Sequence, residues 1–124
     1  MELLESSEDY LERILMLQKE IGTVRSIDLA NSLNYSKASV SVAMKKLKEN
    51  KYIIIDELGY IFLTLKGKEI ANKVLERHEM IAKIFVKLGV SEKQALIDAC
   101  KVEHCLSEET FNAIKETIKK KDLI

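Results

Sequence analysis

Apolar and polar positions alternate along most of the chain with the 3.6-residue period that is typical of amphipathic helices. In residues 7–21, apolar side chains recur three or four positions apart, so we expect the first helix there. Ser6 or Ser7 is predicted to cap this helix, because a hydroxyl can accept a hydrogen bond from the first turn. Asp9 and Glu12 lie three positions apart and share one face, where they either bind a cation or simply complement the helix dipole.

Two shorter helices are predicted next, over residues 26–33 and 37–50, with a tight turn between them. Asn34 ends the first because asparagine tolerates the left-handed conformation, and Ser36 caps the second. This pattern predicts a helix-turn-helix whose second helix lies in the major groove of double-stranded DNA. The candidate DNA contacts are small, hydroxyl-bearing or basic: Arg25, Ser36, Lys37, Ala38, Ser39, Ser41, Val42, Lys45 and Lys46. The alternative is a lysine-rich helix face that is merely solvated.

Residues 52–63 contain two runs of β-branched and aromatic residues around a turn at residues 57–59, which predicts a β-hairpin. A hairpin that directly follows a helix-turn-helix is a wing. Its tip carries Asp56 and Glu57, so we do not expect strong phosphate contacts from the wing itself.

The remaining chain is predicted to be helical. Thr64 caps a long helix that Gly89 ends, Ser91 and Gln94 form a capping box for the next helix, and residues 107–121 form the last one. The absence of proline and the presence of only four glycines also predict a mainly α fold.

Charge and hydropathy narrow the function further. The formal net charge is zero, but acidic residues predominate over residues 1–24 and basic residues over 25–51. This polarity suits a chain that binds cations in one region and phosphates in another. The acidic N-terminus and the lack of a long apolar run predict a cytoplasmic protein with no membrane segment.

Cys100, Glu103 and His104 form the candidate site with the most specific chemistry. On a continuous helix these positions share one face, so a thiol, a carboxylate and an imidazole point together as metal ligands do. His78, the other histidine of the chain, lies on the long predicted helix and could face them. Chance proximity is one alternative. A second alternative is an enzyme that uses Cys100 as nucleophile and His104 as base. The sequence has no glycine-rich loop and no evident substrate cleft, which argues against an enzyme.

Six motifs follow one another along nearly the whole chain. They are Ser7-Glu-Asp-Tyr-Leu-Glu12, Val24-Arg-Ser-Ile-Asp-Leu-Ala30, Ser39-Val-Ser41, Leu63-Thr-Leu-Lys-Gly67, Arg77-His78 and Ala99-Cys-Lys-Val-Glu-His104. In this order the chain resembles the diphtheria-toxin-repressor family of metal-activated transcriptional repressors, especially its short manganese-regulator branch. The resemblance implies a winged helix-turn-helix DNA-binding domain over residues 1–70. It implies a helical metal-binding and dimerisation domain over residues 71–124, without the SH3-like domain of longer members.

The resemblance also implies a set of metal ligands: Asp9, Glu12, His78, Cys100, Glu103 and His104. Asp9 matches the manganese branch, whereas Cys100 matches the iron branch, so the set is a hybrid. A carboxylate suits Mn(II) and a thiolate suits Fe(II), Zn(II) or Cd(II). We therefore expect Mn(II) or Fe(II) as the cofactor, with Zn(II), Cd(II) or Co(II) as substitutes.

Two departures from the family pattern limit the number of ions. A thiolate at Cys100 does not bridge two ions as a carboxylate does, which disfavours a binuclear centre. Ala82 and Leu96 stand where the iron branch has two ligands of its ancillary site, so that site is expected to be absent. The predicted function is a homodimeric, metal-dependent repressor of metal-uptake genes; the alternative is a winged-helix regulator that does not respond to metal.

Overall fold

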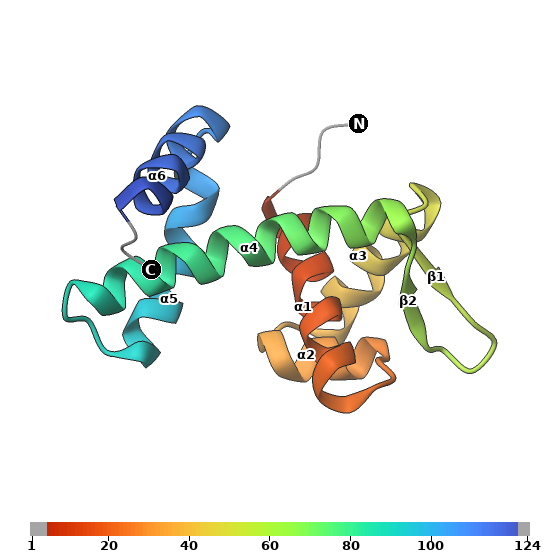
Figure 1. Ribbon diagram of the computed structural model, residues 1–124. Helices are drawn as coiled ribbons and strands as arrows, with labels where there is room; N and C mark the ends of the chain where they lie inside the picture. Colours follow the sequence, from red (N-terminus) through yellow and green to blue (C-terminus); the bar gives the residue numbers. More distant parts are fainter. Residues whose placement is uncertain (1–4, 122–124) are drawn as a thin grey trace. The chain divides into compact units, whose positions relative to one another are not determined.

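The computed structural model describes residues 5–121 and is mainly helical, as the hydrophobic pattern predicted (Figure 1). The chain divides into two units, Met1–Lys73 and Val74–Ile124. The longest helix, α4 (Leu65–Lys87), contributes residues to both.

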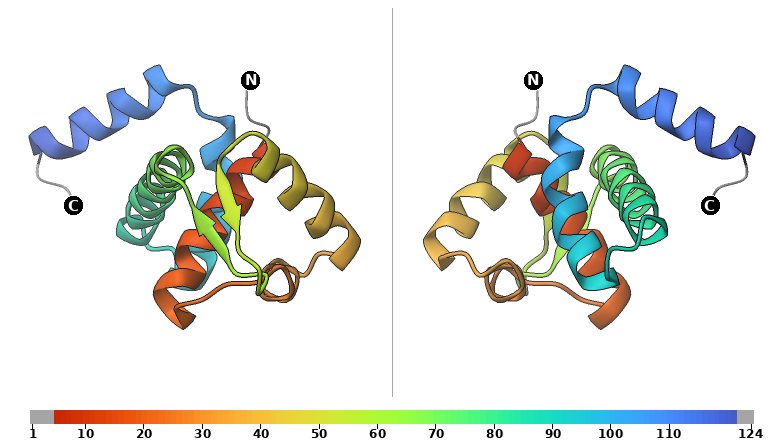
Figure 2. Two further views of the ribbon diagram at one scale, coloured as in Figure 1. Left: turned by 90° about the vertical axis from the view of Figure 1, so that its right-hand side faces the viewer. Right: turned by 90° about the vertical axis from the view of Figure 1, so that its left-hand side faces the viewer.

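The first unit contains three helices and a hairpin. In chain order they are α1 (Glu5–Ile21), α2 (Ser26–Leu33), α3 (Lys37–Glu49), β1 (Ile53–Ile55) and β2 (Ile61–Leu63). Strand β1 lies beside α3 and β2 beside α1 (Figure 2). Apolar side chains from every one of these elements form the core, together with Val24 from the segment between α1 and α2. Those from the elements include Leu11, Ile14, Leu29, Val40, Met44, Ile53 and Ile61.

The predicted helix-turn-helix is confirmed. Asn34 ends α2 in the left-handed conformation, with φ 57°. The Ser36 hydroxyl then accepts a hydrogen bond from the backbone N–H of Ser39 at 3.1 Å, which caps α3. The inner face of α3 packs against the core through three buried apolar residues, Val40, Met44 and Leu47.

One predicted helix cap is wrong, and a second is confirmed without its full capping box. Helix α1 already includes Ser6 and Ser7, because it begins at Glu5, so neither serine is its N-cap. Ser91 does accept a hydrogen bond from the backbone N–H of Gln94 at 3.3 Å. The Gln94 side-chain oxygen, however, accepts no hydrogen bond from the Ser91 backbone N–H in the described part of the chain, and its NH2 group donates to Asp98 at 2.9 Å, so the capping box is only half formed.

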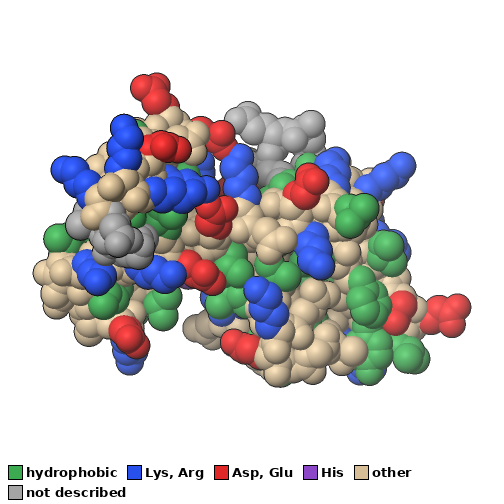
Figure 3. Space-filling model, viewed as in Figure 1, with side chains coloured by type: hydrophobic (Ala, Val, Ile, Leu, Met, Phe, Trp, Pro, Cys, Tyr) green, Lys and Arg blue, Asp and Glu red, His purple; other side chains and the backbone are tan. Residues whose placement is uncertain are grey.

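The hairpin is the predicted wing, and its turn projects away from the three helices of its unit (Figure 1). Its outer face is apolar: Ile54 pairs with Phe62 across the strands, both are exposed, and Leu58 in the turn is 67% exposed. Hydrophobic side chains accordingly gather over the hairpin in Figure 3, beside acidic ones. The acidic tip has a structural role, because one Asp56 carboxylate oxygen accepts hydrogen bonds from the backbone of Leu58 and Tyr60, each at 2.9 Å.

Replacing Asp56 by alanine is expected to destabilise the first unit by about 1 kcal/mol, because two backbone donors in the turn lose their acceptor. Urea unfolding followed by circular dichroism measures this loss. Asp56→Asn is the matched control, since its amide oxygen retains the acceptor without the charge. Equal destabilisation by both variants would show that charge, and not turn geometry, matters at this position.

The second unit continues from α4 into three further segments. They are α5 (Glu92–Val102), a 3₁₀ turn η1 (Glu103–Cys105) and α6 (Glu108–Lys121). Side chains from α4 and α5 form the core of this unit, which consists of Ile81, Ala82, Ala95 and Ala99, with Phe85, Val90 and Leu106 packed against it. No helix among residues 5–121 is both long and apolar enough to cross a membrane.

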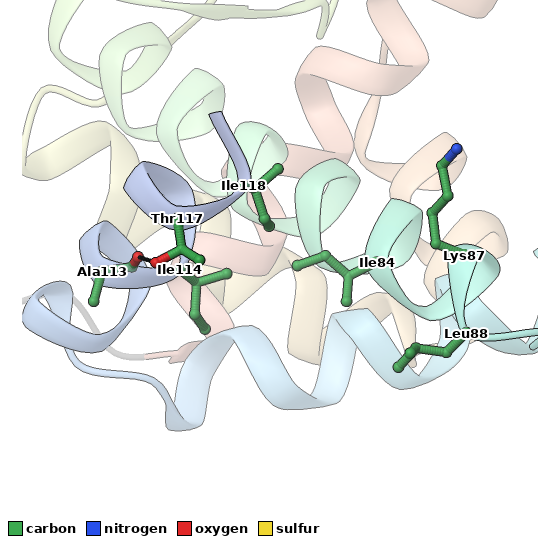
Figure 4. Close-up of a pocket in the computed structure, with 7 residues that line it drawn as sticks. All are labelled: Ile84, Lys87, Leu88, Ala113, Ile114, Thr117 and Ile118. Atoms are coloured by element: carbon green, nitrogen blue, oxygen red, sulfur yellow. Dashed lines mark hydrogen bonds between the residues drawn. The ribbon is translucent and has the colours of Figure 1, made fainter. Parts of the chain in front are cut away.

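Helices α4 and α6 border an open apolar groove of about 620 Å³ (Figure 4). Its lining consists of Ile84, Lys87, Leu88, Ala113, Ile114, Thr117 and Ile118. The Thr117 hydroxyl donates to the backbone carbonyl of Ala113 at 2.9 Å, so its polar group is satisfied within α6. The groove therefore offers an apolar surface to whatever covers it.

Candidate metal centre

His78 is held on α4 with one ring nitrogen already committed. The side chain is buried, and its Nε2 atom lies 3.1 Å from the backbone carbonyl oxygen of Leu96 on α5. A carbonyl can only accept a hydrogen bond, so the proton is assigned to Nε2 and the lone pair to Nδ1. This is the arrangement in which histidine is oriented for a metal ion by a partner on its other nitrogen.

Cys100 and Glu103 come to the same place from α5 and η1. One ligand atom from each of His78, Cys100 and Glu103 lies within 4.8 Å of the others. Ligands bound tetrahedrally to a first-row divalent ion are about 3.4 Å apart, so a small closure of these side chains would complete a coordination sphere. Glu103 is only 2% exposed, and a carboxylate in such a place requires a cation or strong hydrogen bonds. The donor set of imidazole, thiolate and carboxylate fits a borderline transition metal ion.

The backbone around Glu103 differs from the prediction of one continuous helix. Helix α5 ends at Val102, and residues 103–105 form a 3₁₀ turn. A 3₁₀ turn advances about 120° per residue and not about 100°, so His104 is offset by a few tens of degrees from the position that a continuous α-helix would give it. Its Nε2 atom lies 3.4 Å from the Glu103 carboxylate, which makes Glu103 the residue shared by both histidines of this unit.

The other predicted acidic ligands lie in the first unit. Asp9 and Glu12 are both on α1, three positions apart as the sequence predicted, with Glu12 buried and Asp9 partly buried. Cys105, in contrast, is exposed, and its thiol points to the carbonyl of Lys101 at 3.8 Å. Neither cysteine forms a disulfide, and only Cys100 belongs to the donor cluster.

Sequence reasoning missed the role of Arg77, although Arg77-His78 was one of the six motifs. The guanidinium stacks on the Phe111 ring, 4.9 Å from its centroid, and pairs with Glu108 at 3.5 Å. A second ion pair, Glu76 with Lys115, joins the same two helices. Arg77 therefore fixes α4 to α6 at the turn that carries His78, a contact that no local spacing could reveal.

The predicted DNA contacts all lie in the first unit, and most lie on α3. The exposed residues of this helix include all of the predicted ones: Lys37, Ala38, Ser39, Ser41, Val42, Lys45 and Lys46. Arg25 precedes α2, and its guanidinium stacks on the ring of Tyr60 at 4.5 Å, which connects this residue to the hairpin. Ser36 is also exposed but serves as the α3 cap.

Two domains of one protein family match this sequence. The iron-dependent repressor N-terminal DNA-binding domain matches residues 2–58, and the iron-dependent repressor metal-binding and dimerisation domain matches residues 64–122. The chain belongs to the iron-dependent repressor family. An uncharacterized HTH-type transcriptional regulator of Methanocaldococcus jannaschii is 40% identical to it over 113 residues, or 90% of each chain. The HTH-type transcriptional regulator MntR of Bacillus velezensis is 34% identical over 91% of this chain and 80% of its own.

The fold of this repressor is also similar to a solved structure, that of a manganese-dependent transcriptional repressor in complex with manganese. The TM-score is 0.83 at 24% identity, over 91% of this chain and 52% of that one, so this repressor spans about half the length of the solved chain. Family membership confirms the resemblance predicted from the six motifs. A family of transcriptional regulators also points away from an enzyme that uses Cys100 and His104 as nucleophile and base.

Proposed function

We propose that this protein is a cytoplasmic, metal-dependent transcriptional repressor that binds operator DNA of metal-uptake genes as a homodimer. The observation that carries the proposal is the convergence of His78, Cys100 and Glu103 in the second unit of a chain whose first unit is a winged helix. The basic residues on the outer face of α3 are suited to DNA phosphates. Residues 1–70 form the DNA-binding domain in this proposal, and residues 71–124 form the metal-binding and dimerisation domain.

The complete ligand set in this proposal has six members: Asp9, Glu12, His78, Cys100, Glu103 and His104. Bound ions supply a positive charge that holds these donors together. Mn(II) or Fe(II) fits the mixture of carboxylate, imidazole and thiolate, and Zn(II), Cd(II) or Co(II) can substitute because each accepts the same donors. His78 would offer Nδ1 as the ligand atom, because its Nε2 atom is oriented by the Leu96 carbonyl.

The proposed switch follows from where these ligands are in the chain. Asp9 and Glu12 belong to the first unit, and the other four belong to the second. When the two sets bind the same ion or ions, one arrangement of the DNA-binding domain is selected from those that the metal-free protein samples. In a dimer, this arrangement places the two α3 helices about 34 Å apart, which is one turn of DNA.

The second unit carries surfaces suited to the dimer. Val86, Leu88, Leu96 and Ile97 are exposed apolar side chains on or near α4 and α5, and the groove between α4 and α6 adds further apolar area. Such surfaces are typical of interfaces between subunits. We assign these faces to the contact between two copies, in agreement with the dimerisation domain of the family.

The test measures DNA affinity with and without metal. Fluorescence anisotropy with a duplex from the region upstream of the protein's own gene is recorded at fixed salt, first with chelator and then with Mn(II), anaerobic Fe(II) or Zn(II). Binding that increases at least 100-fold with metal supports the switch. Equal binding with chelator would assign the donor cluster a structural role and leave a winged-helix regulator that does not respond to metal.

Replacing Cys100 by glutamate is expected to shift the preference of the site towards Mn(II). The thiolate is a soft ligand that favours Fe(II), Zn(II) and Cd(II), whereas a carboxylate is hard. The ratio of activation constants for Mn(II) and Zn(II) in the anisotropy assay should change by about tenfold or more. Cys105→Glu is the control, because that thiol lies on the surface. If the Mn(II)/Zn(II) ratio is the same in Cys100→Glu as in the wild type, Cys100 is not a ligand.

A further inference from the structure

The face of α3 that lies opposite its buried face is apolar near the N-terminus of the helix. Val40, Met44 and Leu47 define the buried face of this helix. With about 100° per residue, Ala38 and Val42 lie almost opposite that face, four positions apart on one line. Both are exposed, and the Val42 side chain is 57% exposed. The part of α3 that extends furthest from the protein therefore carries methyl groups.

A single exposed valine is ordinary on a protein surface. Val42 differs because a β-branched residue is disfavoured on an exposed helix, where lysine, glutamate or alanine would be more stable. It also lies on the helix that enters the major groove in the proposed function. An apolar group there has only one kind of partner among the base edges, the C5-methyl group of thymine.

The polar side chains near the N-terminus of α3 offer few alternatives for base recognition. The Ser36 hydroxyl accepts a hydrogen bond from the backbone of Ser39 and donates one to the Ser39 hydroxyl at 2.9 Å, so both of its roles are occupied. Residues 37–49 contain no arginine, asparagine or glutamine. The bidentate pairs of arginine with guanine, and of asparagine or glutamine with adenine, are therefore not available to α3, and near its N-terminus only lysines and serines can hydrogen-bond to base edges.

We propose that Val42, assisted by Ala38, is the specificity-determining residue of this helix and recognises thymine methyl groups in each operator half-site. This inference rests on the proposed function, since it assigns chemistry to the same DNA-binding surface. Lys45 and Lys46 flank this line and contact phosphates, which position the helix without selecting a sequence. The DNA that fits best is thus a half-site with thymine at the base pairs that face Val42.

The test removes one methyl group at a time from the DNA. A duplex is first selected from a random-sequence library with the wild-type protein and Mn(II), and each thymine is then replaced by deoxyuridine, symmetrically in both half-sites. We expect a loss of affinity of about threefold to fivefold per half-site at one or two positions, the effect of one buried methyl group. In Val42→Ala the same replacements should change affinity less than twofold, because the partner of the methyl group is gone.

Lys45→Ala is the matched control on the same helix. It should weaken binding to every sequence and reduce its salt dependence while leaving the deoxyuridine penalties unchanged. Deoxyuridine penalties that are the same in wild type and Val42→Ala, or absent at every position, would overturn the assignment of Val42. The absence of any metal-stimulated binding to the selected duplex would instead contradict the proposed function, so the two failures are distinguishable.

Discussion

Glutamine in place of Glu103 is expected to weaken the stimulation of DNA binding by metal severely while the protein remains folded. The Glu103 carboxylate is 2% exposed, and it is the donor that both His78 and His104 approach. The amide has the same shape but no negative charge, so the attraction for a divalent ion is lost with little change in packing. We expect the activation constant for Mn(II) to rise about 100-fold or more, measured by anisotropy with operator DNA at fixed salt.

Glu92→Gln is the matched control, because it makes the same chemical change at an exposed position on α5. Its activation constant should be within twofold of the wild-type value. Helical content from circular dichroism should be unchanged in both variants, which separates loss of a ligand from loss of the fold. Normal metal activation of folded Glu103→Gln protein would contradict the assignment of this carboxylate to the metal centre.

The helix-turn-helix could be predicted because its determinants are local. Val40, Met44 and Leu47 recur with the helical period, and Asn34 and Ser36 carry the end and start signals for α2 and α3 within a few residues of the turn. The start of α1 could not be predicted in the same way. Its serines fit as caps, but acidic residues on both sides also stabilise a first turn, and differences of about 1 kcal/mol decide between such alternatives.

The sequence predicted which chemical groups make up the metal centre, but not how their side chains are oriented. Cys100 and Glu103 are three positions apart, so their proximity depends mainly on local structure. The 3₁₀ turn that rotates His104 and the Leu96 carbonyl that orients His78 depend on how α4 and α5 pack. The same holds for Arg77, whose partners on α6 lie more than 30 positions away in the chain. Spacing along one helix contains no information on such contacts.

Replacing Gly67 by alanine is expected to destabilise the first unit severely, although alanine normally stabilises a helix interior by about 1 kcal/mol relative to glycine. A Cβ atom at this position on α4 would lie 2.1 Å from the Tyr52 carbonyl oxygen and 3.0 Å from its carbon. That carbonyl is part of the backbone and accepts hydrogen bonds from the Thr64 N–H and hydroxyl, both at 3.1 Å, so it cannot move without breaking the junction between hairpin and helix. We expect a loss of about 3 kcal/mol or more in the free energy of unfolding.

Lys68→Ala is the control for Gly67→Ala, because it introduces the same residue at the next position of α4, where the side chain is exposed. Its unfolding free energy should be within about 0.5 kcal/mol of the wild-type value. Urea unfolding followed by circular dichroism compares the two variants. A Gly67→Ala protein as stable as the wild type would show that α4 can separate from the Tyr52 carbonyl at little cost. The contact at Gly67 would then not be what fixes the wing to α4.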